Sequence, residues 1–172
     1  MRYLPLHVDL KGRTVLVVGG GEIARRKVGL LLSAGAKVLL IAPEVSAELE
    51  TLLTGHVIQK TIYAGLPEGA FALVVATTGD RSVNESVSLN ARAANIPVNV
   101  VDAPELSTVV FPAIIDRDPV VVSVGSAATS PVLTRSVREL IETYLPDGVA
   151  RLATYLGDRR EQLKVLLPDI ET

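Results

Sequence analysis

Residues 14–44 carry the pattern that most restricts how this chain can fold. An apolar run, Val15–Val18, ends in three glycines, and a second apolar run occupies 37–41. Gly35 precedes that second run and suits the left-handed end of a helix. The residues between the runs carry one apolar helical stripe, formed by Ala24, Val28 and Leu31. The order predicts strand, glycine turn, helix and parallel strand, which is one βαβ unit.

The glycine turn within this unit also predicts a ligand. Gly19, Gly21 and Ala24 fit the pattern G-x-G-x-x-(G/A), in which backbone approaches a pyrophosphate at a helix N-terminus. The pattern expects an acid for the ribose about 20 residues on. Glu44 arrives slightly later, so Ala42 and Pro43 are expected to meet the ribose through backbone groups. No arginine stands among these residues, which favours NAD over NADP as the dinucleotide.

Strand and helix patterns alternate over the first ~105 residues, which is typical of a parallel sheet. Asp80 can cap the helix after the strand at 71–76. The apolar face of that helix is expected to hold Val83, Val87, Ala91 and Ala94. The remaining expected elements are a helix at 44–53 and strands at 57–63 and 97–101. The fold class predicted for this part is α/β with a Rossmann-like parallel sheet.

A different pattern begins near residue 109. Two β-rich runs, 109–115 and 120–124, flank the turn sequence Asp116-Arg117-Asp118-Pro119 and predict a hairpin whose edges can pair with another chain. Ser130 and Pro131 then start a helix. Its apolar stripe is Leu133, Val137, Leu140, Ile141 and Tyr144. A last helix is expected at 149–166. The predicted division is a dinucleotide-binding domain at 1–108, a dimerisation segment at 109–145 and a short helical region at 146–172.

Composition excludes several other classes. The chain has 172 residues, no cysteine and two histidines, so disulfides, thiolate metal sites and histidine-rich metal cages are excluded and no metal site is predicted. A formal charge of −2 gives no basic footprint for nucleic acid. No apolar run approaches the ~20 residues that cross a bilayer, and the first residues lack a signal-peptide core, so a cytoplasmic protein without membrane contact is expected.

Polar residues at the expected strand ends are candidates for the site. Thr77 and Thr78 follow a buried strand on the ligand side of an open α/β sheet, or they belong to a helix-capping loop. Asp102 ends the next strand, in Asn99-Val100-Val101-Asp102. Its carboxylate can bind substrate or move protons, or it can form an Asx turn near Pro104.

A hydroxylic loop at 123–131 leads into a helix N-terminus, a setting that favours anionic groups, although capping alone explains Ser130. Arg135 and Arg138 lie just inside that helix, and Arg25, Arg26 and Lys27 follow the glycines. Such charges form solvated helix faces, or they bind a substrate with several carboxylates.

Several motifs in register over residues 1 to about 145 resemble the siroheme-synthase N-terminal family, the precorrin-2 dehydrogenases. The motifs are Leu4-Pro5-Leu6, Val17–Lys27, Ala76-Thr77-Thr78, Asn99–Asp102, Phe111-Pro112-Ala113 and Gly125–Pro131. The resemblance implies NAD-dependent oxidation of precorrin-2 to sirohydrochlorin in siroheme synthesis. It also implies a homodimer built through the middle segment and a catalytic role for Asp102.

The resemblance also assigns roles at the remaining positions. The residues expected to bind NAD are Gly19, Gly20, Gly21, Glu22, Ile23, Ala42, Pro43, Glu44, Thr77, Thr78, Asn99 and Val100. Those expected to bind the tetrapyrrole are Ser126, Thr129, Ser130, Arg135 and Arg138. Ser126 also corresponds to a serine that is phosphorylated in some members.

Two further functions stay open at the level of sequence. Some members of the family insert iron, but the sequence has no methyltransferase part like that of multifunctional relatives and a shorter C-terminal helical part than long members, which leaves ferrochelation and its metal open. A non-enzymatic NAD-sensing module would explain the glycines and a dimer. It would not explain Asp102 together with the hydroxylic loop.

Overall fold

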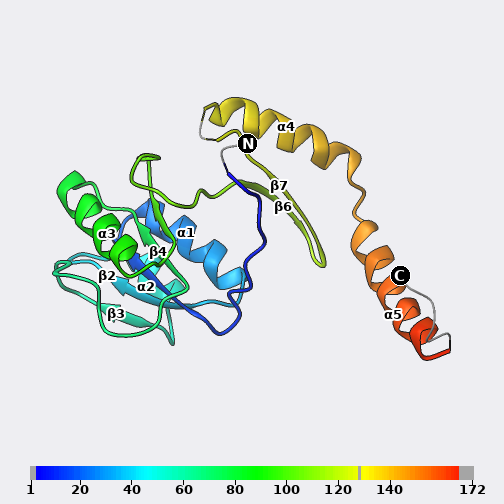
Figure 1. The fold of residues 1–172 in the computed structure, drawn as a ribbon, viewed down its shortest axis with the longest axis horizontal. Helices are drawn as coiled ribbons and strands as arrows, with labels where there is room; N and C mark the ends of the chain where they lie inside the picture. The colour runs from blue at the N-terminus through cyan, green and yellow to red at the C-terminus, as the bar shows by residue number, and fades with distance from the viewer. Residues whose placement is uncertain (1–2, 128, 167–172) are drawn as a thin grey trace. The chain divides into compact units, whose positions relative to one another are not determined.

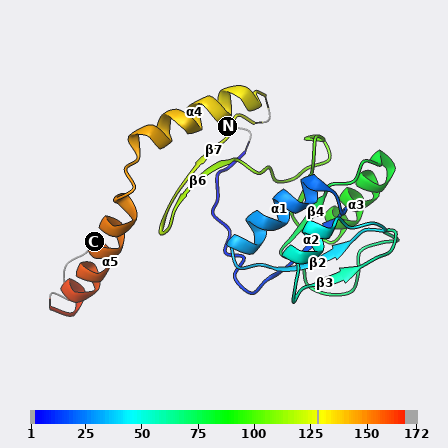
Figure 2. The ribbon, with the colours of Figure 1, turned by 180° about the vertical axis from the view of Figure 1, so that it is seen from behind.

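The chain forms two compact units, one ending at Val110 and the other starting at Phe111 (Figures 1 and 2). The computed structural model describes residues 3–127 and 129–166. Ala128, within the predicted hydroxylic loop, and residues 167–172, at the end of the predicted helical region, lie outside the described residues.

The first unit is a five-stranded parallel sheet, as the alternating pattern predicts, with strand order β3-β2-β1-β4-β5. Its strands are β1 (Thr14–Val18), β2 (Lys37–Ile41), β3 (Val57–Gln59), β4 (Leu73–Ala76) and β5 (Val98–Val100). Its helices are α1 (Glu22–Ser33), α2 (Ala47–Leu52) and α3 (Arg81–Ala93). The chain steps outward from β1 in one direction to β3 and in the other to β5, and the centre of the sheet therefore lies at β1 and β4.

Helices cover both faces of this sheet. Parallel crossovers are right-handed, so α1 and α2, which step one way, lie on one face, and α3, which steps the other way, lies on the opposite face. Leu16 of β1 packs in one buried cluster with Val87 and Ala91 of α3. Val15 and Val17 are equally buried and point to the other face because side chains alternate along a strand. The predicted stripe of α1, from Ala24 to Leu31, is buried.

Several element limits differ from the prediction. The helix expected from residue 44 begins only at Ala47, because Ser46 caps it by accepting a hydrogen bond from the Leu49 N–H. The strand expected at 57–63 ends at Gln59, and the one expected from 71 begins at Leu73. Ala94 is exposed at the end of α3 rather than on its buried face. These differences lie at element ends, where packing against the sheet stops.

The second unit contains the predicted hairpin and two helices. Strands β6 (Ala113–Arg117) and β7 (Val120–Val124) are antiparallel, and Asp116 and Arg117 belong to β6 rather than to the turn. The correction has a simple cause: both residues pair with β7, which leaves only Asp118 and Pro119 in the turn. Helix α4 (Pro131–Tyr144) packs on the hairpin, and α5 (Val149–Leu166) follows at the predicted position.

Three ion pairs join α4 and the residues after it to the hairpin. Arg117 of β6 contacts Glu142 at 3.3 Å and Asp147 at 3.6 Å, and Arg138 contacts Glu142 at 2.9 Å. The predicted apolar stripe of α4 is not buried within this unit, since α4 has no buried residue. In the described part of the chain, no helix is both long enough and apolar enough to cross a membrane.

Candidate functional site

The three glycines after β1 differ in what surrounds them. A Cβ on Gly19 would lie 2.5 Å from the Thr77 Oγ1, and its φ of +117° favours glycine. A Cβ on Gly20 would meet the backbone carbonyl oxygen of Glu44. A Cβ on Gly21 would meet open space. Gly19 and Gly20 are therefore required by packing, whereas Gly21 leaves room beside the first turn of α1.

The start of α1 has no side-chain cap, unlike α2, α3 and α4. Those three helices are capped by Ser46, Asp80 and Ser130, respectively, whereas Gly21 at the start of α1 offers no side chain. The first N–H groups of α1 thus have no capping acceptor, and they border the open space at Gly21. Unpaired N–H groups and the helix dipole favour an anion here, and a pyrophosphate fits that requirement.

Glu22, the first residue of α1, is paired with two arginines. Its carboxylate accepts two hydrogen bonds of 2.7 Å from Arg25 and lies 3.5 Å from Arg26. The hydrogen bonds from Arg25 lower the pKa of Glu22. The charge of Glu22 is therefore balanced by its own helix, so it does not leave an uncompensated negative charge at the predicted pyrophosphate position.

The segment after β2 lies against the glycine turn, where the Ser46 N–H donates to the Gly20 carbonyl at 3.0 Å. Ala42 is buried, and its N–H donates to the carbonyl of Gln59. Pro43 has no N–H, so these two residues can offer a ribose only carbonyl groups. Pro43 and Glu44 are both exposed. Glu44 supplies the carboxylate in this segment, which sequence spacing alone made uncertain.

Thr77 and Thr78 use their hydroxyl groups within the protein. Thr77 Oγ1 donates to the carbonyl of Val18 at 3.0 Å and so joins the ends of β4 and β1. Thr78 Oγ1 donates to the carbonyl of Asp80 or to Asn84 Oδ1. The capping alternative thus describes the Thr78 side chain, and the backbone of this loop remains the part that faces the carboxyl ends of the strands.

Asp102 follows β5 in a turn that many hydrogen bonds hold in place. Its φ is +58°, and its side chain is exposed. Ser107 Oγ accepts from the Val100 N–H and donates to the carbonyl of Val100 or Ala103. Asn99 Nδ2 donates to the carbonyl of Val109. The Asx-turn alternative for Asp102 lacks a donor, because the residue two positions on, Pro104, has no N–H.

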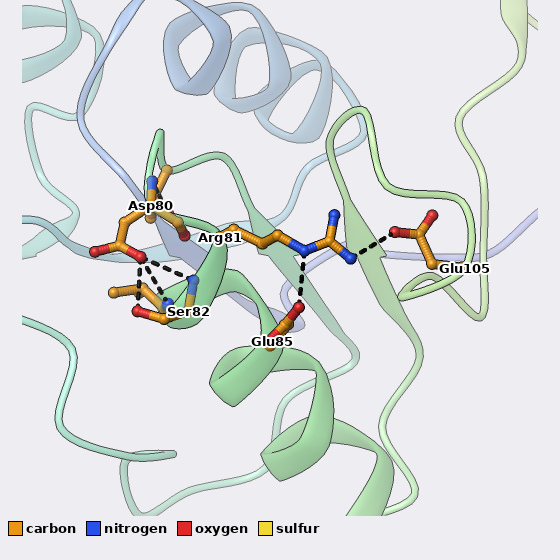
Figure 3. Close-up of polar contacts among 7 residues, drawn as sticks. Asp80, Arg81, Ser82, Glu85 and Glu105 are labelled. Carbon is orange, nitrogen blue, oxygen red and sulfur yellow. Dashed lines mark hydrogen bonds and ion pairs between the residues drawn. The ribbon is translucent and has the colours of Figure 1, made fainter.

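Helix α3 also holds this turn. Arg81 contacts Glu85 at 2.8 Å and Glu105 at 3.3 Å (Figure 3). Arg92 donates to the carbonyl of Glu105, and Ser88 donates to the carbonyl of Leu106 at 2.6 Å. The loop that carries Asp102 is thus fixed to the rigid sheet and helix rather than left free.

A cleft of about 350 Å³ lies between one side of α1 and the turn after β5. Its lining residues are Ile23, Arg26, Lys27, Leu30, Val101 and Asp102. The structure therefore brings the predicted residues Ile23 and Asp102 together. Lys27 joins them as a lining residue that sequence reasoning considered only as part of a charged helix face.

The predicted substrate residues lie in the second unit, around the start of α4. Ser126 Oγ donates to the carbonyl of Ser130 and accepts from Thr134 Oγ1 at 2.7 Å. Thr129 Oγ1 donates to the carbonyl of Ser126 at 2.5 Å. Ser130 Oγ accepts from the Leu133 N–H, as predicted for a helix cap. These hydroxyl groups form one connected turn.

The two arginines predicted to bind substrate differ in their surroundings. Arg138 is paired with Glu142, which also binds Arg117 of β6. Arg135 lies one turn closer to the start of α4 and is exposed. Arg138 therefore helps to hold α4 on the hairpin, and Arg135 is the more accessible of the two cations.

The parallel sheet, the glycine turn and the uncapped start of α1 define a Rossmann-like dinucleotide-binding protein. The chain belongs to the family described as putative NAD(P)-binding, whose model matches residues 6–113. A nicotinamide dinucleotide is accordingly the class of cofactor.

Relatives of known name confirm the resemblance seen in the motifs. The siroheme synthase of Ectopseudomonas mendocina (strain ymp) is 47% identical over 172 residues, which cover 99% of this chain and 37% of that protein. The siroheme synthase of Tolumonas auensis (strain DSM 9187 / NBRC 110442 / TA 4) is 46% identical over 170 residues. The chain thus spans little more than a third of these relatives.

A solved structure extends the similarity to both units. SirC, a precorrin-2 dehydrogenase, matches with a TM-score of 0.75 and 25% identity, covering 99% of this chain and 83% of that one. The predicted fold class, a Rossmann-like sheet followed by a hairpin and helices, is confirmed by this match and by the observed strand order.

Proposed function

We propose that this chain catalyses the NAD-dependent dehydrogenation of precorrin-2 to sirohydrochlorin in siroheme synthesis. The observation that carries the proposal is the likeness of nearly the whole chain to SirC, a precorrin-2 dehydrogenase. The siroheme synthases that match 99% of the chain support the same reaction. We expect the protein to act in the cytoplasm.

The dinucleotide in this proposal is NAD rather than NADP. Its pyrophosphate lies at the uncapped start of α1, beside Gly21, and its adenosine ribose lies near Glu44. A carboxylate such as that of Glu44 suits the two ribose hydroxyls and repels a 2′-phosphate. Arg25, the nearby cation that could attract such a phosphate, is paired with Glu22 and also feels the charge of Glu48.

The oxidation removes one hydride and one proton from the macrocycle, and both electrons leave with the hydride. When bound, the nicotinamide ring supplies the hydride acceptor. The carboxylate of Asp102 accepts the proton and later releases it to water. The fixed turn around Asp102 supports this role, since it holds the carboxylate on a rigid scaffold.

The tetrapyrrole carries eight carboxylates and needs donors to bind them. Ser126, Thr129, Ser130 and the two arginines of α4 remain our proposed binding groups. Arg135 is the stronger cation of this set, because Arg138 is already paired with Glu142. The protein works as a homodimer in this proposal, and the exposed apolar side chains of α4 support such an assembly.

The decisive experiment supplies precorrin-2 and NAD⁺ to the purified protein and follows NADH together with the sirohydrochlorin spectrum. We expect both to appear in step. Asp102→Asn keeps the size of the side chain but removes the base, so we expect turnover to fall at least ~100-fold while the NAD⁺ dissociation constant stays unchanged.

The same variant separates an enzyme from an NAD-sensing module. A sensor would bind NAD⁺ without oxidising precorrin-2, and Asp102→Asn would leave its behaviour unchanged. Ferrochelation stays a separate prediction. Among the described residues, no three or more His, Asp or Glu side chains gather as a metal site. Adding Fe²⁺ or Co²⁺ to sirohydrochlorin, with and without the protein, tests that activity against the uncatalysed rate.

A further inference from the structure

The cleft beside Asp102 combines an apolar wall with three charged groups. Ile23, Leu30 and Val101 provide the apolar part, and Arg26, Lys27 and Asp102 provide the charges. With two cations and one carboxylate, the lining has one positive charge in excess, although the whole chain has a formal charge of −2. The cleft therefore attracts anions against the average charge of the protein.

Lys27 is the half-buried cation of this cleft. Burial lowers the pKa of Lys27, the charge of Asp102 raises it, and the charge of Arg26 lowers it; the net direction is downward. The attraction of Asp102 thus does not make up for the water that the ammonium group has lost. A second carboxylate within the cleft would restore that balance and would bind more strongly here than at a fully solvated lysine.

Arg26 has a weaker claim to such a ligand. Its guanidinium lies 3.5 Å from Glu22, and 70% of its side chain is exposed. Lys27 lies deeper and faces the same cleft as Asp102. The volume of about 350 Å³ is at the small end for ligand pockets, so the cleft suits one edge of a large ligand rather than all of it.

We propose that Lys27, assisted by Arg26, binds a carboxylate of the tetrapyrrole and thereby determines which part of the macrocycle meets Asp102. The inference rests on the proposed dehydrogenase function and adds to it a substrate-specificity residue in the first unit. Because Lys27 and Asp102 line one cleft, a carboxylate held at Lys27 brings the carbon atoms next to it within reach of the Asp102 carboxylate.

The test measures kcat and KM for precorrin-2, and the dissociation constant of NAD⁺, for Lys27→Gln and Arg26→Gln. Loss of a hydrogen bond to a charged group corresponds to roughly a 10-fold to 100-fold loss of affinity. We expect that loss in KM for Lys27→Gln, a smaller rise for Arg26→Gln, and an unchanged affinity for NAD⁺. Lys27→Arg should recover most of the lost affinity because it keeps the charge.

Lys37→Gln is the matched control, since it removes one positive charge from the exposed start of β2, at the other end of the sheet from Asp102. A pH series gives a second readout. The lowered pKa of Lys27 predicts that KM of the unaltered protein rises at a less alkaline pH than for an ordinary lysine, and that Lys27→Gln lacks this rise. Asp102 and Arg26, which act on Lys27, are present in both proteins.

The outcomes separate this inference from the proposed function. No oxidation of precorrin-2 by the unaltered protein would overturn the function, and the inference with it. Turnover by the unaltered protein, with an unchanged KM in Lys27→Gln, would overturn the inference alone. If Lys27→Gln does not fold, as judged by circular dichroism and NAD⁺ binding, Lys27→Arg and Arg26→Gln decide: an unchanged KM in Arg26→Gln and no alkaline rise in the unaltered protein would overturn it.

Discussion

At the scale of single residues, neighbouring glycines have separate tasks, and substitution can separate them. Gly21→Ala places a methyl group in the open space at the start of α1, where the backbone conformation suits any residue. We expect thermal stability to stay nearly constant and the affinity for NAD⁺ to fall roughly 10-fold or more. Gly20→Ala instead meets the carbonyl of Glu44 and should cost about 1–3 kcal/mol of stability.

Thermal melts and NAD⁺ titrations of both variants check this pair. A Gly21→Ala protein that binds NAD⁺ normally would contradict the placement of the pyrophosphate. The sequence pattern identified Gly19 and Gly21, but it could not show why Gly20 is glycine, because the obstructing carbonyl belongs to a residue after the next strand. Lys27 was missed as a site residue for a similar reason: its half-burial and its proximity to Asp102 depend on packing between α1 and the end of β5.

At the scale of secondary structure, capping predicts a pH-dependent stability for α3. The Asp80 carboxylate accepts hydrogen bonds from the Ser82 hydroxyl and from the N–H groups of Ser82 and Val83, and these lower its pKa below 3.8 (Figure 3). The unfolded chain therefore takes up the proton first as the pH falls. The stabilisation is fully present above the unfolded pKa and is lost as the pH falls through the folded pKa.

Melting curves of Asp80→Ala and the unaltered protein measure this effect. We expect the variant to melt at a lower temperature at about pH 7 and the difference to narrow at about pH 3. Arg81→Gln is the control, because it removes only exposed ion pairs, which contribute little. A melting difference that stays constant with pH would contradict a charged cap.

The same element shows what local sequence can predict. The caps at Asp80 and Ser130 were predictable, since capping depends on residues a few positions apart. The hairpin was also predictable, but its turn was not, because the pairing of Asp116 and Arg117 depends on the register with β7. Residue 44 was wrongly taken as the start of α2 for a comparable reason: the loop after β2 must first pass the glycine turn, which it contacts through Ser46.

At the scale of the whole molecule, the apolar side chains of α4 favour assembly with a second copy. Leu133, Leu140 and Tyr144 belong to the predicted stripe, yet they are 58%, 57% and 79% exposed. A helix with this stripe gains stability only where the stripe is covered, and exposed apolar patches commonly mark protein interfaces. The proposed homodimer would cover part of it, which a sequence pattern predicts only as an apolar face without naming its partner.

Leu140→Glu tests this assembly, because a charge in a covered apolar interface opposes association. Analytical ultracentrifugation of the unaltered protein should give a dimer, and the variant should shift toward the monomer at the same concentration. Leu89→Glu is the matched control: Leu89 is 68% exposed and lies on α3 of the first unit, so its variant should stay dimeric. A dimer that survives Leu140→Glu would mean that its interface does not include this part of α4, whereas an unaltered protein that remains monomeric throughout would contradict the homodimer itself.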